Sequence, residues 1–522
     1  MRHALCCGVL VLLAWAVAIA QASPTDGDAK RGHDLYAGRV ALRATTTDGA
    51  PVPPILAACV QCHRPSGLGS FEGGTAIPPI AGRYLFTPFD PDTGHFFAAS
   101  ARHRVRPAYD DDSLGRLLRT GFAPDGQTVR APMPRYAIAD ADIRDLAAYL
   151  RTLSASASSG VDASSVRLAT ITTPGVDPAR AAAMLEVLRA FETARNRQTR
   201  HEFQRSAQTR RAHEMAMNRK FRLWNVVHWA LVGDPATWAA QLERHQAETP
   251  VFGVVAGMGA GDWSPIEAFC ERRRLPCILP QLERIPDLDG QRPRFFSVYF
   301  HAGLAQDAAL AIAALQRSGV RAVELWADGV SPATRQEVEL QLTAAGLTGV
   351  ERARGPGQAV LSLLAPDAHL LRWQARASAP EVLGWAAGPH WQSSARWLAG
   401  SAGASTALLI SELRPADEAA TILRRTEAWL RDAGLSALPL DVAAMTLYAA
   451  TVLGETMLHL DFDFTPEYAL ELIEHRLESM IPLSPYPRLS IGPDQRVASK
   501  GSYIGQVQDG RIAWEWQPTP IR

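Results

Sequence analysis

The segment Cys59-Val60-Gln61-Cys62-His63 constrains this 522-residue chain more than any other feature. Two cysteines that are separated by two residues and followed by histidine form the pattern for covalent attachment of a c-type haem. Each thiol adds across one vinyl group, and the histidine then ligates the iron. A disulfide between the two cysteines is the alternative, but Pro54 and Pro65 disfavour the strand and regular helix that a thioredoxin-like site requires. We therefore expect one covalently bound haem c.

A sixth iron ligand is expected in the same domain, and Met133 is the candidate. It lies in the segment Ala-Pro-Met-Pro-Arg-Tyr, where the flanking prolines favour an extended loop. His95 and His103 are alternative ligands, and Met133 as a simple core residue is a further alternative. With His63 and Met133 both bound, the iron has no open position, so electron transfer is expected and enzymatic chemistry at the iron is not.

Residues 28–155 resemble a class I cytochrome c domain. The matching elements are Gly32-x-x-x-Tyr36, the Cys59–His63 motif, Ile77-Pro78-Pro79-Ile80-x-Gly82, Met133-Pro134 and Leu146-x-x-Tyr149-Leu150. The resemblance implies an all-α fold with one haem, axial ligands His63 and Met133, and packing of Pro78 and Pro79 against the proximal histidine. A proline-broken insertion around Arg83–Pro107 departs from the family pattern.

The amino terminus predicts export. Arg2 and His3 precede an apolar run from Leu5 to Ala20, and Ala20-Gln21-Ala22 provides a small-x-small cleavage site. We expect a signal peptide over residues 1–22, with an uncleaved anchor as the alternative, and no membrane span after cleavage. The 53 basic and 53 acidic side chains give zero net charge, which removes the electrostatic case for nucleic-acid binding. The periplasm is the predicted location.

Residues 152–165 are rich in serine and alanine and predict a linker, and residues 166–522 predict an α/β domain. Strand-like runs are repeatedly followed by a capping residue and a proline, at Asp177-Pro178, Asp234-Pro235, Ser264-Pro265 and Ser331-Pro332. Strands that alternate with helices predict a parallel sheet, and the length predicts two lobes. Ser264-Pro265-Ile266-Glu267 is also the pattern of a capping box.

This second region resembles the periplasmic ligand-binding proteins of the branched-chain amino-acid type, in which two lobes close on a small molecule. The resemblance implies a ligand cleft lined by Gly261, Asp262, Trp263, Ser264, Tyr299 and Asp328. Each residue has a structural alternative: Ser264 caps a helix, Trp263 packs, and Asp262 repels a carboxylate. Whether this region binds a ligand therefore stays open at this point.

Cys270 and Cys277 are predicted to form a helix-to-strand disulfide in an oxidising compartment, with two buried free thiols as the alternative. Arg195–Arg222 is strongly basic and predicts either a solvated face or a docking surface for an acidic redox partner.

Two functions of different classes follow from these domains. The first is a periplasmic cytochrome that passes single electrons from a dehydrogenase to a downstream carrier. The fusion resembles cytochromes that accompany quinoprotein (PQQ-dependent) alcohol dehydrogenase systems, which implies such an enzyme as the redox partner. The second is a solute-binding or sensing protein with a redox-responsive haem. An enzyme acting at the iron is a third alternative, and it requires Met133 to be absent from the iron or labile.

Overall fold

The computed structural model describes residues 27–72, 75–88, 105–153, 158–208, 221–286, 294–388, 390, 393–460, 464–479, 484–487, 489–493 and 495–518. The chain divides into two compact units, Met1–Ala155 and Ser156–Arg522. The predicted signal peptide at residues 1–22 lies outside the described residues, as do His95 and His103. No helix in the described part of the chain is long and apolar enough to cross a membrane.

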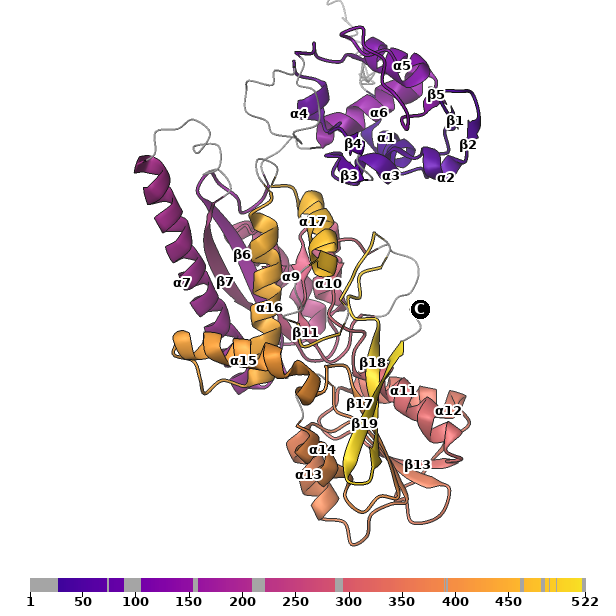
Figure 1. The fold of residues 1–522 in the computed structure, drawn as a ribbon, viewed down its shortest axis with the longest axis vertical. Coiled ribbons are helices and arrows are strands. Elements are labelled where there is room, and N and C mark those ends of the chain that lie inside the picture. The colour runs from indigo at the N-terminus through magenta and orange to yellow at the C-terminus, as the bar shows by residue number, and fades with distance from the viewer. Residues whose placement is uncertain are drawn as a thin grey trace, which may run out of the picture. The chain divides into compact units, whose positions relative to one another are not determined.

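The first unit is built from short helices and two small antiparallel sheets (Figure 1). Its helices are α1 (Ala29–Tyr36), α2 (Pro54–Ala57), α3 (Cys59–His63), α4 (Gly82–Leu85), α5 (Asp111–Thr120) and α6 (Asp140–Thr152). Its strands are β1 (Arg43–Thr45), β2 (Pro51–Val52) and β5 (Arg135–Ala137) in one sheet, and β3 (Ser70–Glu72) and β4 (Thr75–Ile77) in the other. The helices carry most of the buried side chains, and the small sheets connect them.

The first and last helices of this unit cross at a glycine. A Cβ atom on Gly32 would lie 2.0 Å from the carbonyl oxygen of Asp145 and 2.8 Å from the Cβ atom of Tyr149. Only glycine permits this approach, because real Cβ atoms do not come so close to backbone. The rings of Tyr36 and Tyr149 pack at 5.2 Å beside the crossing. Helices α1 and α6 therefore pack closely where they cross at Gly32.

Helix α5 begins at a capping box and ends at a glycine. The Asp110 side chain accepts from the Ser113 N–H at 2.8 Å, and the Ser113 hydroxyl approaches the Asp110 N–H at 2.9 Å, so a reciprocal capping box is formed. Gly121 ends the helix in the left-handed region with φ 85°. Leu114 and Leu118 are buried on the inner face of the helix.

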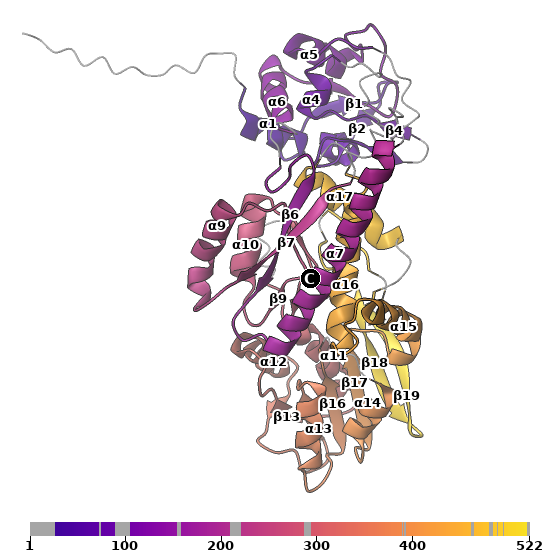
Figure 2. The ribbon, with the colours of Figure 1, turned by 90° about the vertical axis from the view of Figure 1, so that its left-hand side faces the viewer.

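The second unit contains a first lobe built on a seven-stranded sheet in which every pairing is parallel (Figure 2). The strands are β6 (Ser165–Thr172), β7 (Leu223–Ala230), β8 (Gly253–Val255), β9 (Met258–Gly259), β10 (Cys277–Ile278), β11 (Gln281–Leu282) and β12 (Ser297–Val298). The helices of this lobe are α7 (Pro178–Gln208), α9 (Trp238–Glu248), α10 (Ser264–Arg273), α15 (Ala416–Asp432), α16 (Leu440–Met457) and α17 (Pro466–Ser479). Apolar residues of α9 and α10 cover one face, and those of α7, α16 and α17 cover the other.

The second lobe is built on another seven-stranded sheet, ordered β14-β13-β15-β16-β17-β18-β19. Its strands are β13 (Ala322–Trp326), β14 (Thr348–Gly349), β15 (Gln358–Ser362), β16 (Val382–Ala386), β17 (Thr406–Ser411), β18 (Gly501–Gln508) and β19 (Arg511–Pro518). Its helices are α11 (Leu304–Arg317), α12 (Pro332–Ala344), α13 (Pro366–Gln374) and α14 (Ser394–Ser401). The strands from β13 to β17 pair in parallel as predicted, whereas β18 and β19 add an antiparallel hairpin that the sequence did not reveal.

Three of the predicted capping residues do cap their helices. Asp177, Asp234 and Ser331 each accept a hydrogen bond from the first turn that follows them. The predicted capping box at Ser264 is wrong: Asp262 accepts from the Ser264 N–H at 2.9 Å, and Ser264 is itself the first helical residue. The local pattern was ambiguous because two polar residues two positions apart, Asp262 and Ser264, could each supply a cap for this helix.

Three segments connect the two lobes. The chain leaves the first lobe after β12, returns after β17 to form α15 and α16, and enters the second lobe again at β18. Buried residues of α7, α15 and α16 pack in one cluster, which places both later helices with the first lobe. Three segments therefore join the lobes: the one after β12, the one after β17 and the one before β18. We call these three segments the hinge of the second unit.

Candidate haem site and lobe cleft

The haem motif folds as a single helical turn. Helix α3 carries Cys59 at its start and His63 at its end, with Cys62 one turn after Cys59, so both thiols lie on one side of the turn. Neither cysteine is in a disulfide, so the alternative Cys59–Cys62 bridge is not formed. Burial raises the pKa of the Cys59 thiol to about 12 and keeps it protonated. Two unbridged thiols one turn apart are the groups that covalent haem attachment requires.

The His63 ring is buried and held by one backbone acceptor. Its Nδ1 atom lies 2.9 Å from the carbonyl oxygen of Pro78, and a carbonyl can only accept, so Nδ1 carries the proton. The Nε2 lone pair is then available for a metal, which is the arrangement seen around metal-bound histidines. Burial lowers the pKa of His63 to about 4, although the bond to Pro78 opposes this, so the ring is neutral at pH 7. The implied contact between the proline segment and the histidine is present at Pro78.

Two tyrosines fix the backbone on either side of the motif. The Tyr36 hydroxyl donates to the carbonyl of Arg64, the residue directly after His63. The Tyr136 hydroxyl donates to the carbonyl of Ala57 at 2.8 Å, two residues before Cys59. Both tyrosines are buried, and they come from α1 and β5. The haem-binding turn is thus held at both ends by side chains far from it in sequence.

Met133 lies half-buried in the loop before β5. The Arg135 guanidinium donates to the carbonyl oxygen of Met133 at 2.9 Å and to that of Val129, which folds the loop back on itself. The Met133 thioether therefore sits on an ordered loop of the same unit as His63. Its role as an axial ligand stays a prediction.

The residues present fit a haem c. Cys59 and Cys62 would hold its vinyl groups, His63 would offer Nε2 to the iron, and Met133 is the only methionine between Asp28 and Ala155. A thioether and an imidazole are the soft and borderline donors that favour iron in a carrier. The donor set, with the tautomer of His63 fixed by Pro78, supports this assignment.

Two of the predicted cleft residues lie inside the first lobe. Trp263 and Tyr299 are each 1% exposed and belong to one buried apolar cluster. The Tyr299 hydroxyl donates to Glu267 Oε2 at 2.5 Å. A Cβ atom on Gly259 would lie 2.5 Å from the Trp263 ring, so the glycine-rich turn makes room for this ring. Both aromatic side chains pack in the core of the first lobe. For Trp263 this is the packing alternative given in the sequence analysis.

The remaining predicted cleft residues do not meet them. Gly261 is a turn residue with φ 76°, and Asp262 and Ser264 form the helix cap described above. Asp328 lies in the second lobe, where its exposed carboxylate pairs with Arg372. The structure therefore gives Trp263, Tyr299, Asp262 and Asp328 partners within their own lobes.

Cys270 and Cys277 are adjacent but unbridged. Both are fully buried free thiols, one in α10 and one at the start of β10. A hydrogen bond between the two sulfur groups and burial together raise the pKa of Cys270 well above its ordinary value. The predicted disulfide is not formed in this structure, and the alternative of two buried thiols describes it.

The sequence did not predict a charged group that lies between the two lobes. Arg180, in the first turn of α7, pairs with Asp441 at 2.7 Å, and His390, after β16 of the second lobe, lies 3.9 Å from the same carboxylate. Burial and the positive charge of Arg180 lower the pKa of His390. Arg180 follows the Asp177-Pro178 signal by two residues, but nothing local in the sequence relates it to His390 or Asp441.

The comparisons with known proteins agree with this division. Residues 54–154 match the family model described as cytochrome c. No curated protein sequence matches the chain. The second unit is similar in structure to solved solute-binding proteins of the branched-chain amino-acid type and related ones.

Three solved structures illustrate the similarity. A branched-chain amino-acid ABC transporter from Thermus thermophilus with bound valine is 11% identical, with a TM-score of 0.44 over 68% of this chain and 97% of that one. A leucine/isoleucine/valine-binding protein candidate from Rhodopirellula baltica is 14% identical, with a TM-score of 0.46 over 68% and 97%. A fatty acid ABC transporter substrate-binding protein from Thermomonospora curvata is 12% identical, with a TM-score of 0.45 over 69% and 93%.

Proposed function

We propose that this protein is an extracytoplasmic electron carrier that uses one haem c. The haem, when bound, supplies an iron centre that changes between the ferric and ferrous states by one electron. Cys59 and Cys62 would anchor it, and His63 and Met133 would both ligate the iron and leave it no open position, so the protein transfers electrons and is not an enzyme. The observation that carries the proposal is the α3 turn, with two unbridged thiols and a neutral histidine fixed through Nδ1.

The protein's own residues tune the centre. The Pro78 carbonyl accepts from His63 Nδ1, which orients the ring and increases the basicity of Nε2. The Met133 thioether favours the ferrous state, and burial of His63 keeps water away from this side of the site. Together these residues favour a carrier of raised reduction potential.

The ligand set is tested by absorption spectroscopy of the exported, haem-loaded protein. In acid acetone the colour should stay with the polypeptide, and replacement of Cys59 and Cys62 by serine should release it. The reduced protein should show a low-spin, methionine-ligated spectrum that carbon monoxide does not change. Met133→Ala should give a high-spin, carbon-monoxide-binding haem, whereas His95→Ala and His103→Ala should leave the spectrum unaltered. If a histidine variant opens the iron and Met133→Ala does not, the assignment of Met133 is wrong.

The proposed donor is a periplasmic quinoprotein dehydrogenase, and the acceptor is a downstream carrier. This part of the proposal rests on the resemblance of the fusion to cytochromes of PQQ-dependent alcohol dehydrogenase systems. It places the mature chain in the periplasm after removal of residues 1–22. Stopped-flow reduction by such a dehydrogenase should be faster than reduction by an unrelated protein of equal potential. Equal rates would contradict the proposed donor but would not contradict the proposed electron-carrier function.

A second candidate function is binding of a small solute by the two-lobed unit. The observation that favours it is the Arg180–Asp441–His390 group, in which the first lobe offers an arginine and a carboxylate beside a histidine of the second. A panel of small acids, amino acids and alcohols should raise the unfolding temperature of the second unit for at least one compound. Arg180→Gln should abolish the shift, and Arg189→Gln, at an exposed position of the same helix, should retain it. No shift with any compound would contradict this function.

A further inference from the structure

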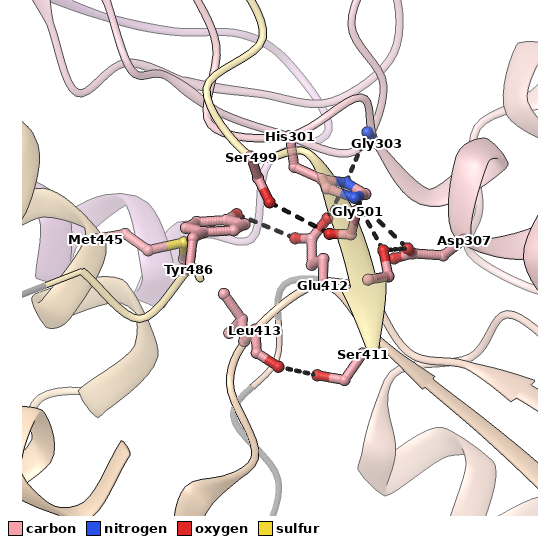
Figure 3. Close-up of polar contacts among 11 residues, drawn as sticks. His301, Gly303, Asp307, Ser411, Glu412, Leu413, Met445, Tyr486, Ser499 and Gly501 are labelled. Atoms are coloured by element: carbon pink, nitrogen blue, oxygen red, sulfur yellow. Dashed lines mark hydrogen bonds and ion pairs between the residues drawn. The ribbon is translucent and has the colours of Figure 1, made fainter. Parts of the chain in front are cut away.

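One buried polar group lies where the three lobe-connecting segments meet (Figure 3). His301 comes from the segment between β12 and α11, and Glu412 directly follows β17. Ser502 is the second residue of β18, and Asp307 lies in the first turn of α11. Each connection between the lobes therefore contributes at least one side chain to the same cluster.

The side chains form a continuous chain of contacts. His301 Nδ1 lies 2.5 Å from Glu412 Oε2, and His301 Nε2 lies 3.1 Å from the Ser502 hydroxyl. The Ser502 hydroxyl donates to Asp307 Oδ1 at 2.5 Å. The Tyr486 hydroxyl donates to the second oxygen of Glu412 at 3.1 Å. An imidazole is thus bound between two carboxylates, one directly and one through a serine.

This group is closed off from water. Asp307 is 0% exposed and Glu412 is 2% exposed, and Asp307 Oδ2 has no hydrogen-bond partner among the residues that the structure describes. A buried carboxylate oxygen without a donor is costly unless a positive charge or a proton lies nearby. The 2.5 Å contact between Nδ1 and Oε2 is a hydrogen-bond distance, which leaves no room for a cation between these atoms. A proton is therefore the species that this group is built to hold.

The Nδ1 atom of His301 faces two competing partners. When it carries a proton it donates to Glu412, as the 2.5 Å contact requires. When it has lost that proton it accepts from the N–H of Gly303, which lies 3.1 Å away. Gly303 is the N-cap residue of α11, the helix that begins the second lobe. One atom cannot do both, so the proton selects which element of the hinge His301 binds.

Other charged groups surround the cluster. Tyr486 faces Glu412, Asp307 and Asp441, and His390 and Arg180 lie beyond Asp441. Burial opposes a charge on His301, but Glu412 and Asp307 outweigh it and raise the pKa of His301 to about 9. Burial raises the pKa of Asp307 to about 7, against the effect of the His301 charge. The cluster is therefore poised to change its proton content near and above neutral pH.

We propose that His301, Asp307 and Glu412 form a proton-controlled clamp on the hinge of the second unit. With the imidazole protonated, the clamp joins the segment after β12 to the segment after β17 and to β18. Loss of the proton to solvent leaves two buried carboxylates facing each other without a cation, and the Glu412 contact is released. The lobes are then freer to move at the hinge.

The direction of the pH effect follows from the two raised pKa values. A group with a raised pKa stabilises the folded arrangement at low pH, and that contribution is lost as the pH rises through the folded value. For Asp307 the loss begins above the ordinary carboxyl pKa and is complete near pH 7, and for His301 it begins above the ordinary imidazole pKa and is complete near pH 9. The clamp should therefore be firm at pH 6 and weakened at pH 9.

The test is hydrogen exchange of the full, haem-loaded protein between pH 6 and pH 9, with rates corrected for intrinsic base catalysis. Protection of peptides that contain residues 299–303, 411–413 and 499–502 should fall with pH, by at most about tenfold per pH unit for each linked proton. Protection of the central strands β15 and β16 should stay constant. Protection at the hinge that does not depend on pH would overturn the proposal.

Variants and a chelator separate the clamp from other causes. Asp307→Asn should remove the part of the fall near pH 7, and Asp367→Asn, an exposed position in α13, should leave the profile unchanged. An Asp307→Asn profile that matches the wild type would overturn the proposal. A metal other than iron that is lost in Asp307→Asn, or a wild-type profile altered by chelator, would also overturn it, because a cation would then occupy the cluster. If Asp307→Asn does not fold, the wild-type profile alone decides.

Discussion

Asn196 should be one of the most sensitive positions in the second unit. It is buried in α7, and its amide binds both backbone groups of Trp224 in β7. Asn196 Nδ2 donates to the Trp224 carbonyl at 2.9 Å, and the Trp224 N–H donates to Asn196 Oδ1 at 2.7 Å. Strand β7 pairs with β6 alone, so this side chain takes the place of a neighbouring strand on the open side.

Asn196→Ala leaves one donor and one acceptor of the backbone without these partners. Each buried group left unpaired costs about 1–3 kcal/mol, which gives about 2–6 kcal/mol for the pair. Water can reach the edge of a sheet more easily than its centre, so we expect a loss near the lower end, about 2–3 kcal/mol. Asn196→Asp keeps the acceptor but turns the donor into a carboxylate that repels the Trp224 carbonyl. The loss of stability in Asn196→Asp should become smaller as the pH falls, because the carboxyl group then gains a proton that it can donate.

Urea unfolding followed by tryptophan fluorescence measures these losses, and haem absorbance reports the first unit separately. Gln198→Ala is the control, because Gln198 is exposed on the same helix and should change stability by less than about 0.5 kcal/mol. If the free energy of unfolding of Asn196→Ala differs from that of the control by less than about 0.5 kcal/mol, the amide contributes little and the reasoning is refuted. An Asn196→Asp deficit that grows on acidification would refute it as well.

Three other predictions concern the second unit. Burial lowers the pKa of His369 to about 4, so its stabilisation should be lost as the pH falls from about 6.5 towards 4; His369→Gln should flatten that part of the urea-midpoint profile, and an unchanged slope would contradict this. Gly259→Ala should destabilise the lobe by about 1–3 kcal/mol, because its Cβ would meet the Trp263 ring at 2.5 Å; unaltered unfolding would show that the turn can yield. Cys270 and Cys277 should resist a maleimide in the native protein and both react in denaturant without reductant, whereas no reaction would reveal a bridge.

Signals that lie within a few residues of one another predicted the structure well. The haem motif at residues 59–63 folds as one helical turn. Asp177-Pro178 and Ser331-Pro332 both precede helices as expected. These features succeed because their physics is local: a side chain caps its own turn, and a cysteine pair reaches one side of one turn.

Features that depend on distant segments were not accessible from the sequence. His301, Glu412 and Ser502 are separated by about a hundred residues at each step, and no local pattern relates them. The positions of the predicted cleft residues were also not accessible from the sequence. Trp263 and Tyr299 follow strand ends, where ligand-binding residues often lie, but the first lobe closes over both rings. Burial of a side chain is decided by the elements that pack on it, and periodicity alone does not reveal them.

The hairpin β18–β19 has a consequence for biosynthesis. Strand β17 at residues 406–411 pairs with β16 on one side and with β18 on the other, and β18 is made only after α15, α16 and α17. During synthesis, the apolar edge of the second-lobe sheet at β17 therefore stays unpaired until α15, α16 and α17 of the first lobe have been made. Such delayed long-range pairing slows folding and exposes an edge to aggregation. Chaperones that shield nascent chains should therefore affect the yield of this protein more than that of a separately made haem domain.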